Sequence, residues 1–146
     1  MKVFLEVDKG HNAGARYEIA QRSYRAVGRA GGADLTVQLS KEGDQVLDPD
    51  DIRRVEDHLH KRSGKPAHSD KPRLGAFSRG RDIRIDDEKV SRAHAMVFVD
   101  DDGPSVVDLG STNGTRVNGD RVEDAELSEG DIVHIGKTRF VVKIEP

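Results

Sequence analysis

Short segments in which hydrophobic and polar residues alternate run through most of the chain. In the first of them Val3, Leu5 and Val7 alternate with Phe4, Glu6 and Asp8, and a period of two predicts a β-strand with one buried face. Further short strands are predicted at residues 15–20, 24–27, 35–39, 82–85, 95–99, 105–109, 115–118, 132–135 and 139–144. Glycine, asparagine and aspartate residues separate them as turn formers. Many short strands joined by turns favour an all-β sandwich or barrel.

One segment has the spacing of a helix instead. Asp48 is a good N-cap and Pro49 suits the first helical position. Hydrophobic residues then recur at helical intervals, at Ile52, Val55 and Leu59. The pattern predicts a helix over residues 49–62, with Arg54 and its charged neighbours on the polar face. Residues 63–72 are polar and contain two prolines, so we expect a flexible loop there.

Composition narrows the possible classes of function. The 146 residues carry a net charge of −3 with acids and bases interleaved, and no basic block of the kind that binds a nucleic-acid backbone stands out. The absence of cysteine excludes disulfides, thiolate catalysis and cysteine-based zinc sites. No apolar run is long enough to span a bilayer, and the start of the chain turns acidic before a signal peptide could form. We therefore expect a cytoplasmic protein that binds neither membranes nor nucleic acid.

Three segments in the second half of the chain combine turn residues with hydrogen-bond donors. They are VSRAH at 90–94, DLGSTNGT at 108–115 with VNG at 117–119, and GDIVHIG at 130–136. Asn113-Gly114 alone would be a common hairpin turn. The first two segments, however, place Ser91, Thr112 and Asn113 on loops beside guanidinium groups. A phosphomonoester, with about −1.5 to −2 charges near neutral pH, needs such short donors and the planar fork of an arginine.

The same segments resemble the forkhead-associated (FHA) family. The similarity is carried by VSRAHA, DLGSTNGTRVNG and LSEGDIVHIG, is dense from Asp82 to Ile144, and is looser at VGR over residues 27–29. It implies an FHA/SMAD-like β-sandwich of about eleven strands, formed by residues 1–146 as a single domain. Loops at one end of the sandwich would bind phosphothreonine peptides, because the family reads phosphorylated motifs with arginine.

The resemblance also implies roles for single residues. Arg29 of VGR would grip the phosphate, and Ser91 would donate a hydrogen bond to it. Thr112 would lie beside the phosphothreonine, while Asn113 would hold the neighbouring peptide backbone. Lys89 would select the residue three positions after the phosphothreonine.

Four further residues in these motifs have supporting roles. Gly28, His94 and Gly114 are expected to be structural, since the histidine would brace the loops and the glycines would permit tight backbone. Arg92 is a secondary candidate for the peptide site.

The sequence departs from the family pattern at one place. In the family the Gly-Arg pair closely precedes the Asp-Ile strand, whereas here Arg29 lies far upstream of Asp82. Either residues 38–76, including the helix, are an insertion and Arg29 still closes on Ser91, or Arg79 or Arg81 has taken over its role. We favour the insertion because VGR ends a predicted strand and keeps the local order of the family. A long insertion is tolerable, since loop closure costs only about 0.6 kcal/mol per doubling of loop length.

Other classes of function fit the residues less well. His58, His60 and His68 could suggest a metal site, but His58 and His60 would point to different faces of the helix, so we expect surface histidines, no metal and no cofactor. Ser91, His94 and Asp108 lack the spacing of a catalytic triad, so we do not expect an enzyme.

The expected function is that of a monomeric binding module in bacterial signalling. Its partner would be a phosphothreonine-containing protein such as a Ser/Thr kinase or one of its substrates. The alternative is a domain that keeps the fold but binds its partners without phosphate.

Overall fold

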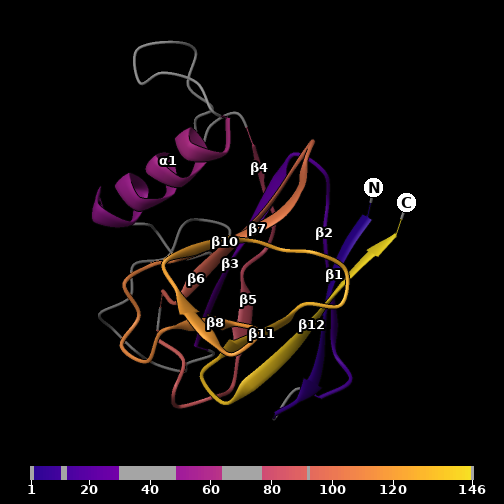
Figure 1. Cartoon of the computed structure of the whole chain (residues 1–146). Coiled ribbons are helices and arrows are strands. Elements are labelled where there is room, and N and C mark those ends of the chain that lie inside the picture. The colour runs from indigo at the N-terminus through magenta and orange to yellow at the C-terminus, as the bar shows by residue number, and fades with distance from the viewer. Residues whose placement is uncertain (1, 11–12, 30–48, 64–76, 92, 146) are drawn as a thin grey trace.

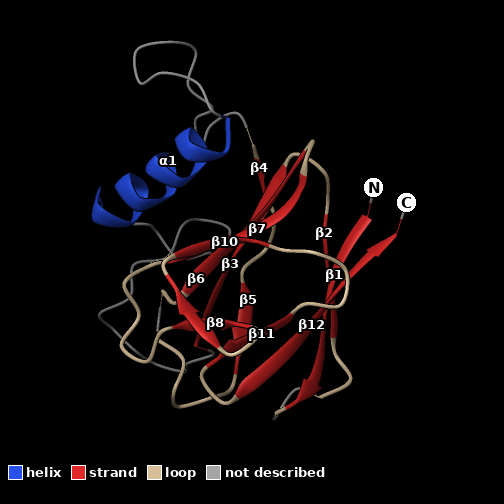
Figure 2. Ribbon diagram, viewed as in Figure 1, coloured by secondary structure: helices blue, strands red, loops and turns tan. Residues whose placement is uncertain are grey.

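The structure is a computed structural model, and it describes residues 2–10, 13–29, 49–63, 77–91 and 93–145. In this part of the chain twelve strands form two six-stranded sheets that face each other as a sandwich (Figures 1 and 2). The first sheet has the order β2-β1-β12-β11-β8-β9. Its strands are β1 (Lys2–Lys9), β2 (Arg16–Ile19), β8 (Thr115–Val117), β9 (Asp120–Val122), β11 (Ile132–Ile135) and β12 (Thr138–Glu145).

The second sheet has the order β10-β7-β6-β3-β4, with β5 also paired to β3. Its strands are β3 (Ser23–Arg29), β4 (Ser78–Arg79), β5 (Ile83–Ile85), β6 (Ala95–Asp100), β7 (Gly103–Asp108) and β10 (Asp124–Glu126). Both β4 and β5 run parallel to β3, one after the other along its length. β4 and β5, which follow the helix in the sequence, therefore both pair with β3, the strand that precedes the helix.

The main core lies between the two sheets and follows the predicted alternation. Along β1 the side chains of Val3, Leu5 and Val7 point inward and are at most 3% exposed. They pack with inward residues of both sheets, among them Val97, Ile135 and Phe140. At the outer ends of β1 and β12, Lys2 is paired with Glu145, so the two ends of the chain lie side by side (Figure 1).

A second hydrophobic cluster covers the outer face of the second sheet. Helix α1 (Pro49–Ser63) packs over this face and inserts Val55, which is fully buried. The cluster also contains Tyr24, Ala26, Met96, Phe98, Val107 and Leu109. Because β6 is covered on both faces, its sequence AMVFV is apolar without alternation. Among the described residues, no helix is long and apolar enough to cross a membrane.

The all-β sandwich with one helix confirms the predicted fold class. The helix occurs where the pattern predicts it. The twelve strands of the described residues agree with the eleven or so that the resemblance implies, and the short strands β4, β9 and β10 were not predicted from the alternation. The predicted strand at 35–39 and the loop at 63–72 fall largely outside the described residues. The assignment of residues 38–76 as an insertion in a single domain therefore stays a prediction.

Candidate functional site

Loops at one end of the sandwich bring together five of the residues singled out in the sequence. Arg29, Lys89, Ser91, Thr112 and Asn113 all line one open pocket of about 370 Å³, together with Glu88 and Val90. They come from the end of β3, the loop between β5 and β6, and the loop between β7 and β8.

Arg29 reaches this pocket through the backbone pairing of β3. Its N–H donates to the carbonyl oxygen of Ser91 at 3.0 Å, and it stands opposite Ile85 in the parallel pair with β5. The buried Gly28 just before it is aligned with Arg84. Despite the long intervening segment, the structure places Arg29 next to Ser91.

The alternative arginines belong to the segment that pairs with β3 before it reaches Arg29. The backbone of Arg79 pairs with Tyr24, five positions before Arg29 on β3, which corresponds to about 16 Å along the strand. The side chain of Arg79 is outside the described residues, as is the whole of Arg92. Arg81 is exposed, and its carbonyl oxygen accepts a hydrogen bond from Arg25.

The two loops that face Arg29 are bonded to each other. The backbone N–H of Thr112 donates to the hydroxyl oxygen of Ser91 at 3.1 Å, and the side-chain amide of Asn113 donates to the carbonyl oxygen of Lys89 at 2.8 Å. Since Ser91 accepts in this contact, its hydroxyl proton remains a donor for a ligand. The pocket therefore combines two basic side chains with a hydroxyl held in place.

His94 connects the same two loops from below and is fully buried. Its Nδ1 accepts from the backbone N–H of Ser91 at 3.0 Å, and its Nε2 lies 2.9 Å from the carbonyl oxygen of Gly114, to which it donates. Burial lowers the pKa of His94, although the contact with Gly114 and the nearby carboxylates of Asp108 and Asp87 act in the opposite direction. Both ring nitrogens are thus engaged with main-chain atoms, and the ring is neutral.

The loop after β7 is shaped by Asp108 and by glycine. The Asp108 carboxylate accepts hydrogen bonds from the backbone of Gly110 and Ser111 and from the hydroxyl of Thr115. Gly114 has a φ of +80°, and a Cβ atom there would lie 2.6 Å from Nε of Arg121. The left-handed backbone conformation favours glycine at this position, and a side chain here would also displace Arg121.

Asp87 is a support that sequence reasoning missed. This buried carboxylate accepts from the backbone N–H of Lys89, the backbone N–H of Lys137 and the hydroxyl of Thr138. It therefore fastens the loop before Ser91 to the β11–β12 turn. No local signal in the sequence distinguishes it from the neighbouring acids.

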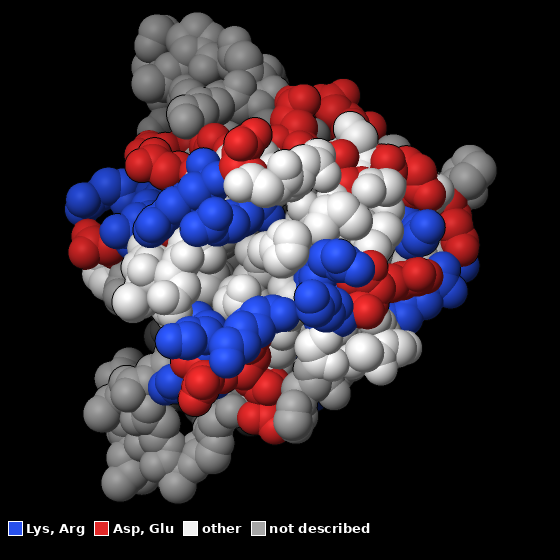
Figure 3. Space-filling view, turned by 60° about the horizontal axis from the view of Figure 1, so that its bottom comes forward, with Lys and Arg blue, Asp and Glu red and all other residues white. Residues whose placement is uncertain are grey.

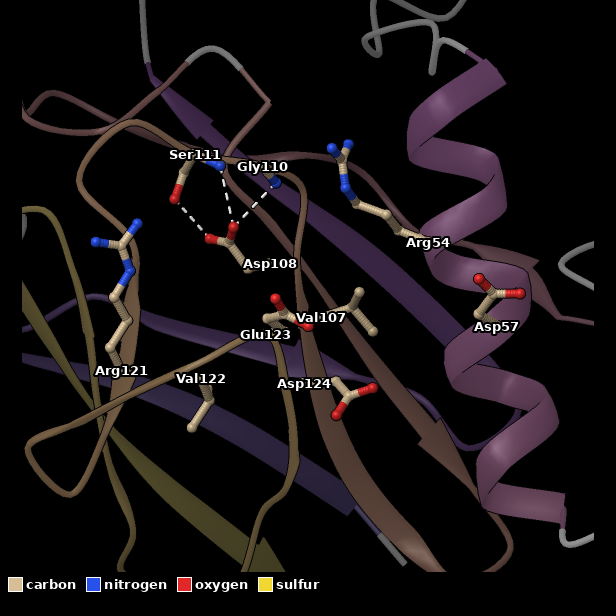
Figure 4. Close-up of a pocket in the computed structure, with 10 residues that line it drawn as sticks. All are labelled: Arg54, Asp57, Val107, Asp108, Gly110, Ser111, Arg121, Val122, Glu123 and Asp124. Carbon is tan, nitrogen blue, oxygen red and sulfur yellow. Dashed lines mark hydrogen bonds between the residues drawn. The ribbon is translucent and has the colours of Figure 1, made fainter.

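A larger cleft of about 660 Å³ lies behind the loop of Gly110 and Ser111, between α1 and the β9–β10 segment (Figure 4). Arg54 from the helix and Arg121 from β9 stand on either side of the loop, and Asp57, Glu123 and Asp124 lie lower in the cleft. The guanidinium of Arg54 approaches Gly110 so closely that a Cβ atom would lie 3.0 Å from it. The predicted polar face of the helix therefore faces the sandwich at this point.

His58 is buried, contrary to the expectation of a surface histidine. It is 4% exposed, its Nε2 lies 2.9 Å from the hydroxyl of Ser105, and its Nδ1 lies 3.4 Å from the carboxylate of Asp124. The side chains of His60 and His68 fall outside the described residues. Within the residues that are described, no three His, Asp or Glu side chains could together hold a metal ion.

Comparison with known proteins finds a family match in the sequence of one segment and a fold match for the whole chain. The family described as "FHA domain" matches residues 73–136. Over 65 residues the chain is 48% identical to the glycogen accumulation regulator GarA of Mycobacterium tuberculosis, covering 44% of this chain and 40% of that protein. The match thus spans less than half the length of this curated relative.

Solved structures extend the likeness to the whole chain. The FHA domain of protein CT664 from Chlamydia trachomatis has a TM-score of 0.61 at 21% identity, with 100% of both chains covered. A structure described as an analysis of phosphothreonine-dependent FHA domain interactions has a TM-score of 0.58 at 23% identity, covering 100% of this chain and 99% of that one. At these identities the likeness shows a shared fold. Residues 73–136 therefore match the forkhead-associated family in sequence, and with the strands that complete their two sheets they share the fold of FHA domains.

Proposed function

We propose that this protein binds a phosphothreonine-containing segment of a partner protein, as a reader in phosphorylation-dependent signalling. The observation that supports this most strongly is the backbone contact of Arg29 with Ser91, which brings an arginine from β3 to the loops of the SRxH and STNGT motifs. The family reads phosphorylated motifs through arginine.

The chemistry of the pocket suits a doubly charged phosphate. Arg29 offers a planar fork, Ser91 a hydroxyl proton, and Lys89 a second positive charge at the rim. Thr112 would contact the phosphothreonine methyl group and Asn113 the adjacent peptide backbone. Charge-assisted hydrogen bonds contribute about 1.5–3 kcal/mol each, so three or four of them support binding in the micromolar range after ordering costs.

We further propose that the role is not catalytic. His94, which alone in the SRxH motif could act as a base, has both nitrogens bonded to main-chain atoms of Ser91 and Gly114. The protein would act as a monomer in the cytoplasm, on a Ser/Thr kinase or one of its substrates. The name of GarA, a regulator of glycogen accumulation, is consistent with a regulatory role for its relatives.

The test is calorimetric titration with the best phosphothreonine peptide from an oriented library. We expect micromolar binding of the phosphopeptide and none of its unphosphorylated form. Arg29→Ala and Ser91→Ala should each raise the Kd at least about tenfold, which corresponds to one charge-assisted hydrogen bond.

Arg79→Ala and Arg81→Ala are the matched controls, and both should bind as the wild type does. If Arg29→Ala binds normally while one of these controls does not, the phosphate lies elsewhere. Equal binding of both peptide forms would instead favour a phosphate-independent interaction.

A further inference from the structure

Four basic side chains form a row across the outer face of the first sheet. Cross-strand pairing aligns Arg121 with Arg116, Arg116 with His134, and His134 with Arg139. Their neighbours Thr115, Val133 and Phe140 are buried in the sandwich, so by alternation the row lies on the outer face of the sheet. Arg116 and Arg121 are exposed there, whereas His134 and Arg139 are half-buried and Nδ1 of His134 is buried. We call Arg121, Arg116, His134 and Arg139 the basic row.

Like charges opposite each other on neighbouring strands destabilise a sheet. Arg139 is compensated by the carboxylate of Asp8 at 2.8 Å. Arg116 and Arg121 are exposed and face each other, and within the described part of the chain neither has an ion-pair partner. Arg116 and Arg121 are thus two neighbouring exposed guanidinium groups that are accessible to negative charge on another molecule.

The basic row begins directly behind the phosphate-binding loops. Arg116 follows Gly114 by two residues, and Arg121 packs against the backbone of Gly114. At the other end, Asp87 ties the loop of Lys89 and Ser91 to Lys137, two residues before Arg139. Figure 3 shows groups of Lys and Arg side chains on this end of the molecule, with uncharged surface between them and Asp and Glu side chains beside them.

We propose that the basic row binds acidic side chains that flank the phosphothreonine in the same partner segment; this rests on the function proposed above. Three gaps between neighbouring strands make the row about 14 Å long, and an extended peptide covers that distance with about four residues. Two alternate residues of such a stretch point to the same side. The partner is therefore a phosphothreonine peptide with acidic residues at alternate positions on one flank.

The experiment compares three phosphothreonine peptides with the same central residues. The first peptide has Glu at alternate positions of the four residues after the phosphothreonine. The second has Glu at alternate positions of the four residues before it. The third has Gln in place of every one of these Glu residues. They are titrated into the wild type, into Arg116→Gln/Arg121→Gln, and into a charge-matched control, Arg22→Gln/Arg53→Gln, whose arginines are exposed and lie outside the row.

For the wild type we expect one acidic peptide to bind about five- to tenfold more tightly than the Gln peptide, as two exposed ion pairs allow. The gain should disappear in Arg116→Gln/Arg121→Gln, persist in the control, and shrink between about 50 mM and 500 mM salt because Arg116 and Arg121 are exposed. In each protein the gain is measured against its own affinity for the Gln peptide, and the control variant should bind that peptide as the wild type does. Arg116→Gln alone, which leaves the contact with Gly114 intact, should lose part of the gain.

Two results would overturn the inference while leaving the proposed function intact. One is equal binding of all three peptides by the wild type, and the other is loss of the gain in the control variant. If no phosphopeptide binds at all, the proposed function fails and this inference fails with it. Tight binding of a single-stranded oligonucleotide that depends on Arg116 and Arg121 would assign the row to nucleic acid and also overturn it.

Discussion

Asp87 illustrates how one buried side chain can hold a binding site together. Burial by itself would raise the pKa of its carboxyl group, but hydrogen bonds from Lys89, Thr138 and Lys137 outweigh it and hold the pKa below its usual range. The carboxylate is therefore charged in the folded protein at neutral pH. Gly136 leaves room for this carboxylate, because a Cβ atom at Gly136 would lie only 2.9 Å from Oδ2 of Asp87.

We predict that Asp87→Asn destabilises the protein by about 1–3 kcal/mol at pH 7, as expected for lost hydrogen bonds to a charged group. Because the pKa is lower in the folded than in the unfolded state, the contribution of Asp87 is complete above the unfolded value of about 4 and is lost as the pH falls through the folded value. Urea unfolding of the wild type and of Asp87→Asn between pH 3 and pH 7 measures the difference in their free energies of unfolding. The contributions of the other carboxylates are the same in both proteins and cancel in this difference. A difference that stays constant down to pH 3 would contradict the prediction.

The sequence predicted the residues of the pocket better than the residues that support it. Ser91, Thr112 and Asn113 sit in local motifs, so their turn chemistry is visible in a few neighbouring positions. Two of the three partners of Asp87 lie 50 and 51 positions downstream, and its role follows only from the meeting of two loops. The same holds for Arg121, whose contact with Gly114 depends on the β8–β9 pairing.

At the scale of elements, α1 serves as the cover of an otherwise exposed sheet face. Phe98 at the centre of that face contacts the rings of Tyr24, Phe77 and His58. Val55 and His58, three positions apart, form the buried stripe of the helix. A histidine in this stripe is accommodated because Ser105 and Asp124 offer polar partners beneath it.

We predict that Val55→Ala destabilises the protein by about 2 kcal/mol, since it removes buried methyl groups and leaves a cavity beside Phe98. Ile52→Ala on the same helix is the matched control. Ile52 is 39% exposed, so its loss should change stability by less than about 0.5 kcal/mol. Guanidinium unfolding curves give the free energy of unfolding of each variant. Equal losses of stability in Val55→Ala and Ile52→Ala would mean that Val55 does not anchor the helix.

The helix was predictable because its cap and periodicity are local, whereas β9 and β10 were missed. Both strands are three residues long and rich in charge, as in Asp120–Val122 and Asp124–Glu126. They lie at the edges of the two sheets, where short charged strands are common and hydrophobic alternation is weak. β9 and β10 are recognised as strands only through their pairing with β8 and β7, which the local sequence does not reveal.

At the scale of the whole molecule, the N-terminal strands are central to the sandwich even though the matched family segment begins at residue 73. In the first sheet β1 lies between β2 and β12, and in the second β3 lies between β6 and β4. Their inward side chains, including Leu5 and Val27, are at most 1% exposed. The two halves of the chain therefore share one core.

We predict that a fragment of residues 73–146 does not fold alone, because both sheets would lose a central strand and the apolar area it buries. The full chain should give a dispersed amide spectrum and a cooperative thermal transition, while the fragment should give neither. A fragment that unfolds cooperatively near the Tm of the full chain would show that β1 to β3 are dispensable.

The pairing of Lys2 with Glu145 also fixes where anything joined to this domain must start. β12 runs for eight residues from the turn beside the pocket to that pair, which is about 24 Å of extended strand. Both attachment points thus lie at the end of the sandwich remote from the pocket of Arg29 and Ser91. A neighbouring module, a fluorophore or a surface tether attached at either terminus would leave the loops around this pocket accessible to a partner protein.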